Sequence, residues 1–318
     1  MAANGATEVF LPNCDKPMPL IGMGTSSDPP SDPETAKAAI LEAIKAGYRH
    51  FDTAFAYGSE KPLGAAITEA LRLGLVKSRD ELFITTKLWS SFAEKDAVVP
   101  ALKMSLSNLQ LDYVDMYLIH WPLRLSKEVR KMPVERHEIL PLDAAAVWEG
   151  MEECKHLGLT KGIGVSNFSP RRLDELLAKA KIPPSVNQVE MNPFWRQERL
   201  MEYCKEKGIH VSAYSPLGAN GTKWGDNRVV DSDVLGEIAR AKGKSSAQVS
   251  LRWVYEQGAS IVSKSYNKQR MRDNLNILDF SLSDEDRERI GKLPQRKGVL
   301  FANVLGQHDI VLEVDAEL

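Results

Sequence analysis

Short runs of branched apolar residues alternate along the chain with longer segments in which apolar residues recur at helical spacing. The runs predict buried strands of a parallel sheet, and the longer segments predict amphipathic helices that cover it. Glycines such as Gly47, Gly74 and Gly158 directly follow predicted helices, which is typical of helix C-termini. The predicted strands are residues 20–25, 50–52, 82–88, 114–120, 162–166, 186–190, 209–214 and 260–264. The predicted helices are residues 33–46, 64–73, 97–109, 142–157, 170–180, 197–207, 233–242, 246–255 and 268–276.

Eight strand–helix units in succession predict an α/β fold, a (β/α)₈ TIM barrel that forms a single domain over residues 1–318. A doubly wound open sheet is the alternative. Apolar residues on either side of a polar turn, at 9–11 and 17–19, predict an N-terminal β-hairpin. Long irregular stretches follow the fourth and seventh strands, at 124–141 and 217–230. We expect both, together with a C-terminal tail from residue 294, over the C-terminal face, where such barrels build their sites.

Composition and charge narrow the class of protein. The chain has 41 basic and 43 acidic residues, so no global field favours nucleic acid or an acidic membrane surface. It has neither a secretory signal nor an apolar run long enough to span a bilayer. The three cysteines and six histidines show no metal-ligand spacing, and so few cysteines fit a reducing compartment, where we expect them to be small buried residues. We therefore expect a cytoplasmic monomer that binds no nucleic acid, membrane or metal.

Polar or ionisable residues stand at the ends of the second to eighth predicted strands. They are Asp52, Lys87, His120, Ser166, Asn167, Gln188, Tyr214, Ser215, Lys264 and Ser265. Each alone is more often structural, but the ends of parallel strands in a barrel meet at one face. A buried lysine or aspartate without a partner is costly, so these groups should pair with one another or with a ligand. Seven strand ends in phase therefore favour a functional site.

Asp52, Tyr57 and Lys87 together predict acid–base chemistry. Asp52 and Lys87 leave adjacent strands and should form an ion pair, and Tyr57 follows on the loop after Asp52. Because an ammonium favours a phenolate, we expect Lys87 to lower the pKa of Tyr57 from about 10. Tyr57 could then donate a proton to a developing alkoxide, while His120 hydrogen-bonds the same oxygen. This arrangement suits the reduction of a carbonyl group.

A carbonyl reductase of this kind needs a hydride donor, and no side chain supplies one. Ser166, Asn167 and Gln188 have the donors and acceptors to bind a carboxamide, and Tyr214 offers a flat face to a nicotinamide ring. These residues predict a nicotinamide cofactor.

A second group of residues indicates where its phosphates bind. Lys264, Ser265 and Arg270 surround a predicted helix N-terminus, which suits the 2′-phosphate of NADPH; an ordinary solvated helix start is the alternative. The glycine pattern at Gly22 and Gly24 lacks the third glycine of a dinucleotide-binding turn, so the nucleotide would bind without a Rossmann unit.

Six segments in order resemble the aldo-keto reductase family. They are Phe51-Asp52-Thr53-Ala54-x-x-Tyr57-Gly58, Thr86-Lys87-Leu88-Trp89, Leu118-Ile119-His120-Trp121-Pro122, Gly164-Val165-Ser166-Asn167-Phe168, Asn187-Gln188 and Lys264-Ser265-Tyr266-Asn267. The resemblance covers nearly the whole chain and implies a barrel that binds NADPH, with a catalytic tetrad of Asp52, Tyr57, Lys87 and His120. It also implies cofactor contacts from Thr25, Asp52, Ser166, Asn167, Gln188, Tyr214, Ser215, Leu217, Lys264, Ser265, Asn267, Arg270, Asp273 and Asn274.

Within that family the chain is most similar to the plant-type ketone and aldehyde reductases. The segments at 150–154, 182–184 and 253–258 carry this closer resemblance. Two positions depart from it. Ser26 stands where aldose reductases have a pocket tryptophan, and Phe55 replaces a small residue that is usual in plant members. Both changes alter the shape of the substrate pocket, so we carry over no aldose-reductase preference.

We therefore expect an NADPH-dependent reductase of an aldehyde or ketone, with Tyr57 as the proton donor. A sugar uronate and a ketone of specialised plant metabolism are both candidate substrates. Two other functions remain open. One is an NADPH-binding, redox-sensing module with negligible turnover. The other is a barrel aldolase with Lys87 as a Schiff-base nucleophile, against which the neighbouring Asp52 argues because an ion pair keeps the amine protonated.

The substrate pocket is predicted from aromatic and basic residues after the strands. Trp89, Trp121, Phe194 and Trp195 follow the third, fourth and sixth strands and could line a pocket beside His120, although each could equally be plain packing. The loop after the fourth strand has an excess of basic residues that could bind an acidic substrate such as a uronate; a solvated loop is the alternative. These residues are Arg124, Lys127, Arg130, Lys131 and Arg136, against Glu128, Glu135 and Glu138.

Overall fold

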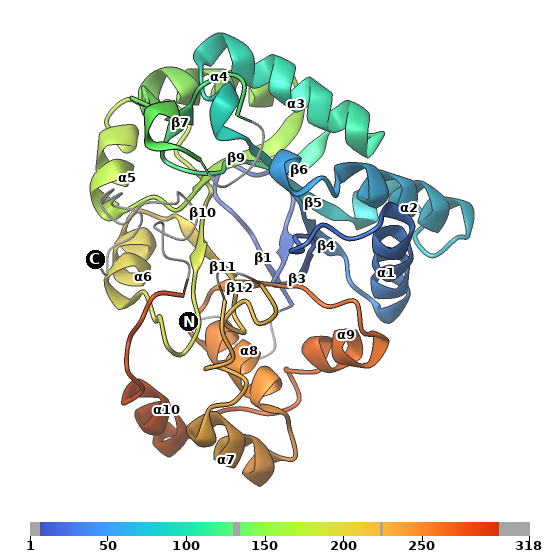
Figure 1. Ribbon diagram of the computed structural model, residues 1–318, viewed down its shortest axis with the longest axis vertical. Coiled ribbons are helices and arrows are strands. Elements are labelled where there is room, and N and C mark those ends of the chain that lie inside the picture. The colour runs from blue at the N-terminus through green and yellow to red at the C-terminus, as the bar shows by residue number, and fades with distance from the viewer. Residues whose placement is uncertain (1–6, 130–133, 223–224, 299–318) are drawn as a thin grey trace.

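Eight parallel strands close into a barrel in the order β10-β11-β12-β3-β4-β5-β6-β9 (Figure 1). The computed structural model describes residues 7–129, 134–222 and 225–298. The strands are β3 (Ile21–Gly24), β4 (His50–Asp52), β5 (Phe83–Leu88), β6 (Val114–Ile119), β9 (Thr160–Ser166), β10 (Val186–Glu190), β11 (His210–Tyr214) and β12 (Ser260–Ser263). The last strand, β12, pairs with the first, β3, so the sheet has no free edge. The predicted barrel is therefore confirmed, and the open-sheet alternative is wrong.

Helices surround the barrel (Figure 1). They are α1 (Pro33–Ala46), α2 (Glu60–Arg72), α3 (Lys95–Leu109), α4 (Ala144–His156), α5 (Pro170–Leu177), α6 (Glu198–Glu206), α7 (Asp233–Lys242), α8 (Ser246–Glu256), α9 (Lys268–Leu275) and α10 (Asp284–Gly291). Helix α2 begins four residues before its predicted start. The prediction placed the start too late because Glu60, a polar residue buried in the first turn, interrupts the apolar pattern. Over the described ranges, the helices are all too short or too polar to cross a bilayer.

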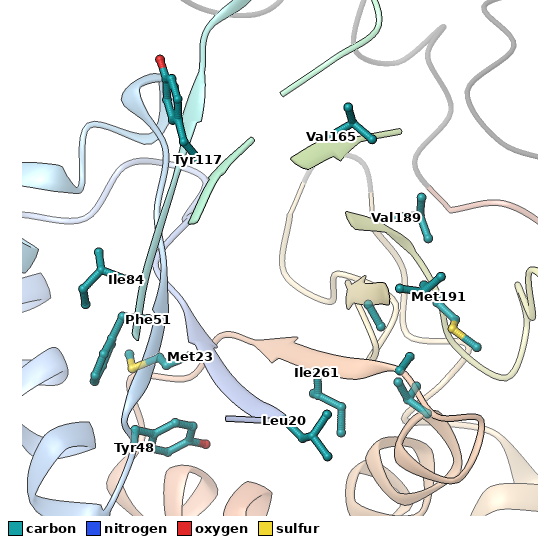
Figure 2. Packing of buried hydrophobic residues seen from close by; sticks show 14 of the residues in the cluster. Leu20, Met23, Tyr48, Phe51, Ile84, Tyr117, Val165, Val189, Met191 and Ile261 are labelled. Carbon is teal, nitrogen blue, oxygen red and sulfur yellow. The ribbon is translucent and has the colours of Figure 1, made fainter. Parts of the chain in front are cut away.

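The apolar core lies between the strands and the helices, since successive strand residues point to opposite faces. Phe51 of β4, Ile84 of β5 and Met23 of β3 belong to one cluster with residues of α1 and α2, and Figure 2 shows them close together outside the barrel strands. Asp52, which follows Phe51, and Lys87, three positions after Ile84, lie on the opposite face of their strands, toward the inside of the barrel. This alternation is what brings polar side chains from different strands to one place.

The predicted hairpin is present at the N-terminal end of the barrel. Strands β1 (Glu8–Val9) and β2 (Met18–Pro19) pair in antiparallel fashion. Leu11 and Met18 pack against Phe83 and Met116, which lie near the starts of their strands. Because the hairpin covers this end, a ligand site inside the barrel has to open at the other end.

The loops at the C-terminal end are partly ordered by their own contacts. The loop after β6 contains a second small hairpin, β7 (Arg124–Leu125) with β8 (Ile139–Leu140), which the sequence did not predict. The start of the tail crosses to the end of β10, where the amide of Gly298 donates to Glu190 Oε1 at 3.0 Å. The rest of the predicted tail wall, residues 299–318, lies outside the described residues, as do Arg130 and Lys131.

Candidate active site

Asp52 and Lys87 form a buried ion pair at the C-terminal ends of β4 and β5. Lys87 is 1% exposed, and its Nζ donates to Asp52 Oδ1 at 2.5 Å and to the carbonyl of Thr53 at 3.0 Å. The other carboxylate oxygen of Asp52 accepts from Gln188 Nε2 at 2.8 Å. Burial works to lower the pKa of Lys87, but Asp52, together with Tyr57, outweighs it and raises the pKa. The amine therefore stays protonated, which disfavours its use as a Schiff-base nucleophile.

Tyr57 lies beside this pair, on the short 3₁₀ helix η1 (Phe55–Tyr57) that follows β4. Lys87 Nζ is 4.9 Å from the centre of the Tyr57 ring. Burial raises the pKa of Tyr57, and the charge of Lys87 opposes that rise without overcoming it. The prediction of a lowered pKa was therefore wrong in its net direction, because it considered the ammonium and left out the larger effect of desolvation.

His120 completes the group from the end of β6. Its Nε2 lies 3.3 Å from the Tyr57 hydroxyl, and its ring stacks on Trp121 with centroids 5.7 Å apart. Burial, aided by the charge of Lys87, lowers the pKa of His120 well below its usual value, so the imidazole is neutral. Its Nδ1 is buried and has no hydrogen-bond partner among the described residues. The structure thus brings all four residues of the predicted tetrad together, with a phenol between a cation and a neutral imidazole.

The residues predicted to bind a carboxamide form a hydrogen-bonded chain on β9, β10 and β11. Ser166 Oγ donates to the carbonyl of Gln188 at 2.8 Å. Asn167 Nδ2 donates to Ser166 Oγ at 3.0 Å and to the carbonyl of His120 at 3.1 Å. The hydroxyl of Tyr214 donates to Asn167 Oδ1 at 2.8 Å. This chain fixes the rotamers of the predicted nicotinamide-binding residues and links them to His120.

The backbone is strained at two of these strand ends. Asn167 and Ser215 have positive φ angles of 63° and 49°, in the left-handed region that non-glycine residues seldom adopt. Such strain is of order 1–3 kcal/mol and is found mostly at functional sites. Thr25, also predicted to contact the cofactor, is buried and donates to the carbonyl of Asp52 at 3.0 Å, while Leu217 is half-buried in the loop after β11.

Two cationic side chains, Lys264 and Arg270, lie near each other at the predicted phosphate site. The side chain of Asn267 caps α9, since its Oδ1 accepts from the amide of Arg270 at 3.0 Å. Burial, and then the charge of Arg270, lower the pKa of Lys264. Within the described chain, neither cation forms an ion pair with an acidic side chain. Adjacent, unneutralised cations at a helix N-terminus fit a phosphate monoester such as the one that distinguishes NADPH.

The remaining residues predicted near the cofactor take part in local contacts. Ser265 Oγ accepts from the amide of Asn267 at 3.2 Å. Asp273 Oδ1 accepts from Gln269 Nε2 at 2.9 Å, and the buried Asn274 directs its Nδ2 at Ser263 Oγ at 3.5 Å. Asn274 thus also links α9 to the end of β12, whereas the contact of Asp273 lies within α9.

The aromatic residues of the predicted pocket divide into two kinds. Trp89 donates from Nε1 to the carbonyl of Val129 at 3.0 Å and packs in a cluster beneath the loop after β6, which Phe55 also joins. Phe194 packs in the main core. By contrast, Trp195 is 6% exposed, and its Nε1 is buried without a hydrogen-bond partner. Trp121, stacked on His120, and Trp195 therefore remain candidates for substrate contact.

The predicted basic excess of the loop after β6 is partly neutralised by a residue that the sequence analysis missed. Arg124 and Lys127 both pair with Glu94, which precedes α3, and the Lys127 pair has a distance of 3.4 Å. Glu94 lies 30 residues before Arg124, so no local pattern predicts the contact. Arg136 is exposed, and Arg130 and Lys131 lie outside the described ranges.

Comparison with known proteins adds a family and several relatives. Residues 20–294 match the profile of the Aldo/keto reductase family. The chain is 71% identical over 301 residues to D-galacturonate reductase of Fragaria ananassa, covering 95% of this chain and 94% of that protein. It is 54% identical to deoxymugineic acid synthase 1-D of Triticum aestivum, covering 92% of each. A solved aldo-keto reductase of Bombyx mori in complex with NADP is 34% identical, with a TM-score of 0.83, covering 94% of this chain and 97% of that chain.

Proposed function

Because the chain belongs to the aldo/keto reductase family, we propose that it reduces the aldehyde group of an acidic sugar, a uronate, with Tyr57 as the proton donor. Reduction of a small carbonyl compound with NADP(H) is the chemistry of the family. The observation that supports a uronate as the substrate is the 71% identity, over 95% of this chain, to a protein named for D-galacturonate.

The proposed roles in proton transfer follow from the geometry around Tyr57. A bound nicotinamide cofactor would supply the hydride that the carbonyl carbon needs. Tyr57 gives its proton to the carbonyl oxygen, and Lys87, protonated beside Asp52, stabilises the phenolate that remains. Neutral His120, 3.3 Å from the Tyr57 hydroxyl, hydrogen-bonds the same oxygen and orients the carbonyl.

The cofactor would be held at two ends. Ser166, Asn167, Gln188 and Tyr214 would bind the nicotinamide end, since they form one hydrogen-bonded chain next to His120. At the other end, the two cations after β12 would bind the phosphate. The further cofactor contacts that we propose are those of Thr25, Asp52, Ser215, Leu217, Lys264, Ser265, Asn267, Arg270, Asp273 and Asn274.

A carboxylate on the substrate has a candidate partner in Lys297. Lys297 is 7% exposed, and its Nζ lies 5.9 Å from the centre of the Trp195 ring. The segment that contains Lys297 is fixed to the loop that contains Trp195, because the amide of Arg296 donates to the carbonyl of Phe194 at 2.8 Å. A buried ammonium and the unpartnered Trp195 Nε1–H are together a donor set for a carboxylate. Trp195 lies in the loop after β10, at the C-terminal end of the barrel, and the segment after α10 brings Lys297 to it.

Two substrates that differ only in charge test the proposal. D-galacturonate and D-galactose share their stereochemistry and differ at C6, where one has a carboxylate and the other a hydroxymethyl group. We expect kcat/KM, followed by NADPH absorbance, to be at least about tenfold higher for the uronate, since a hydrogen bond to a charged group contributes about 1.5–3 kcal/mol. Equal values for the two sugars would rule out an acidic substrate. A panel of ketones should then identify the alternative class.

The same pair tests Lys297. A Lys297→Met variant should lose most of the preference for the uronate while its rate with a neutral aromatic aldehyde stays within about threefold of the wild type. Arg136→Met is the matched control, because Arg136 is an exposed cation in the loop after β6. If Lys297→Met keeps the preference, the carboxylate binds elsewhere.

A further inference from the structure

Two adjacent side chains after Tyr57, Ser59 and Glu60, are buried although both are polar. Ser59 is 6% exposed and Glu60 is 2% exposed. Burying a hydroxyl or a carboxylate is unfavourable unless hydrogen bonds replace its hydration. The partners of these two residues therefore show which parts of the fold they connect.

Ser59 belongs to a hydrogen-bonded chain of three hydroxyl groups, and the donor of each hydrogen bond can be assigned. Thr25 Oγ1 donates to the carbonyl of Asp52 at 3.0 Å. Because a hydroxyl has one proton, Ser59, 2.7 Å away, must donate to Thr25. Thr53, at 2.9 Å, must in turn donate to Ser59. The chain thus connects the segment after Tyr57 to Thr53, which follows Asp52, and through Thr25 to the carbonyl of Asp52 itself.

Glu60 makes the corresponding connection to the strand of Lys87. Its Oε1 accepts from the hydroxyl of Thr86 at 2.7 Å, and its Oε2 accepts from Asn108 Nδ2 at 2.9 Å. Thr86 directly precedes Lys87 in β5. Ser59 and Glu60 therefore fix the end of the Tyr57 loop to the immediate neighbours of both members of the ion pair.

The loop also has contacts of its own: the Tyr57 ring packs edge-on against His120, with centroids 5.4 Å apart, and Phe55 packs against the cluster beneath the loop after β6. Gly58, with a φ of 67°, adds none, since no described atom beyond its chain neighbours lies within 4 Å of the position that a Cβ would take. The contact from Tyr57 to His120, at 3.3 Å, is long for a hydrogen bond. The position of the phenol thus depends also on where the chain enters α2, which is at Ser59 and Glu60.

We propose that Ser59 and Glu60 are positioning residues for proton transfer: they hold the Tyr57 hydroxyl at the correct distance from Lys87 and His120. Neither residue touches the reacting atoms. The inference rests on the proposed role of Tyr57 as the proton donor. A displacement of about 1 Å in a reacting group can lower a rate by about 10²-fold, so loss of either contact should appear in kcat.

Kinetics of Ser59→Ala and Glu60→Leu test the proposal. We expect kcat to fall about tenfold or more in each, while the NADPH Kd and the carbonyl KM stay within about threefold. Because the phenol would move away from Lys87, its pKa should rise, and the alkaline limb of kcat should move to higher pH. Ser59→Thr and Glu60→Gln keep the hydrogen bonds, the latter because Asn108 can flip its amide, and should restore most of kcat.

A double variant separates this inference from the role of Tyr57. If Ser59 acts through Tyr57, adding Ser59→Ala to Tyr57→Phe should not lower the residual kcat further. Additive losses, or a loss confined to KM, would overturn the positioning role while leaving Tyr57 as the donor. If Ser59→Ala fails to fold, the double variant that combines Glu60→Leu with Tyr57→Phe provides the same test. A Tyr57→Phe variant with normal kcat would instead overturn the proposed function.

Discussion

Burial and the charge of Lys87 act on the pKa of Tyr57 in opposite directions, and the sequence does not show which effect is larger. The ion pair of Lys87 with Asp52 was predictable, because the two residues end adjacent strands with side chains on the same face. The pKa of Tyr57 was not, because burial depends on how closely the loops pack over the strand ends. The raised pKa favours a protonated phenol, ready to donate, near neutral pH.

Replacing the phenol tests its role directly. A Tyr57→Phe variant keeps the ring and removes the hydroxyl, so NADPH should bind with unchanged affinity while kcat falls by about 10²–10⁴-fold, the usual contribution of general acid catalysis. NADPH fluorescence titration measures the first quantity and steady-state absorbance the second. A variant that keeps more than a tenth of the wild-type kcat would contradict the assignment.

Sequence patterns identified the site residues at the strand ends, but they did not predict the contacts that orient these residues. Asp52, Lys87 and His120 could be found because strand ends converge in a barrel. The hydrogen bond from Gln188 to Asp52 joins residues 136 positions apart, and no local pattern predicts it. Ser59 also escaped, because a serine after a glycine is typical of an ordinary turn.

Elements with a strong apolar period were the ones that could be predicted. Helix α10 was not, because Ile290 is its single buried residue and its capping box, Ser283 with Asp286, has no apolar run after it. The hairpin β7–β8 has two residues in each strand, too few to show a period of two. Polar capping contacts therefore define α10, whereas the hairpin buries Leu125 in a small cluster of its own.

Two of the three segments that carry the plant-type resemblance, 150–154 and 182–184, contact each other in the fold. Glu152 of α4 accepts from the amides of Lys181 and Ile182 at 2.7 and 2.8 Å, so the carboxylate holds the turn between α5 and β10. Gly150 allows α4 to approach α3, since a Cβ there would lie 2.8 Å from the carbonyl of Lys95. This resemblance therefore reflects helix packing outside the barrel and says nothing of the substrate.

Helix α9 should determine the preference for NADPH over NADH. Lys264→Met and Arg270→Met each remove a cation from the proposed phosphate site, so the Kd for NADPH should rise about tenfold or more while the Kd for NADH changes little. Lys268→Met is the matched control, because Lys268 lies on the same helix and pairs with Glu42 at 3.1 Å. Equal effects on both nucleotides would place the 2′-phosphate elsewhere.

At the scale of the whole molecule, the two ends of the barrel differ in chemistry. The N-terminal end is closed by the hairpin, and Asp115 fixes it there. This fully buried carboxylate accepts from Lys16 at 3.1 Å, from Arg79 at 2.7 Å and from the amide of Ile84 at 2.7 Å. Both oxygens of Asp115 are thus hydrogen-bonded within the protein. At the C-terminal end, the His120 Nδ1 and the Trp195 N–H have no partner among the described residues, and both lie where we propose that ligands bind.

Two histidines near the closed end should make the stability of the barrel sensitive to acid. His50 Nδ1 lies 3.0 Å from the carbonyl of Pro19, and His210 Nε2 accepts from the amide of Ser260 at 3.2 Å. Protonation of His210 Nε2 would abolish that acceptor. Burial, and then the charge of His50, lower the pKa of His210 to about 4, and burial also lowers that of His50. The native fold thus favours a neutral His210.

The sign of the pH dependence follows from these shifts. Between pH 6.5 and about 4 the unfolded chain binds a proton at His210 that the folded chain does not, so the stabilisation is complete above pH 6.5 and is lost as the pH falls. From pH 7 to pH 5 the free energy of unfolding should drop by up to about 2 kcal/mol from this residue, an upper value because His210 is partly exposed. Urea unfolding at the two pH values measures it. His210→Gln keeps an acceptor for Ser260 and should remove most of the drop, whereas His156→Gln, at an exposed position of α4, should retain it. An unchanged drop in His210→Gln would assign the acid sensitivity to other groups.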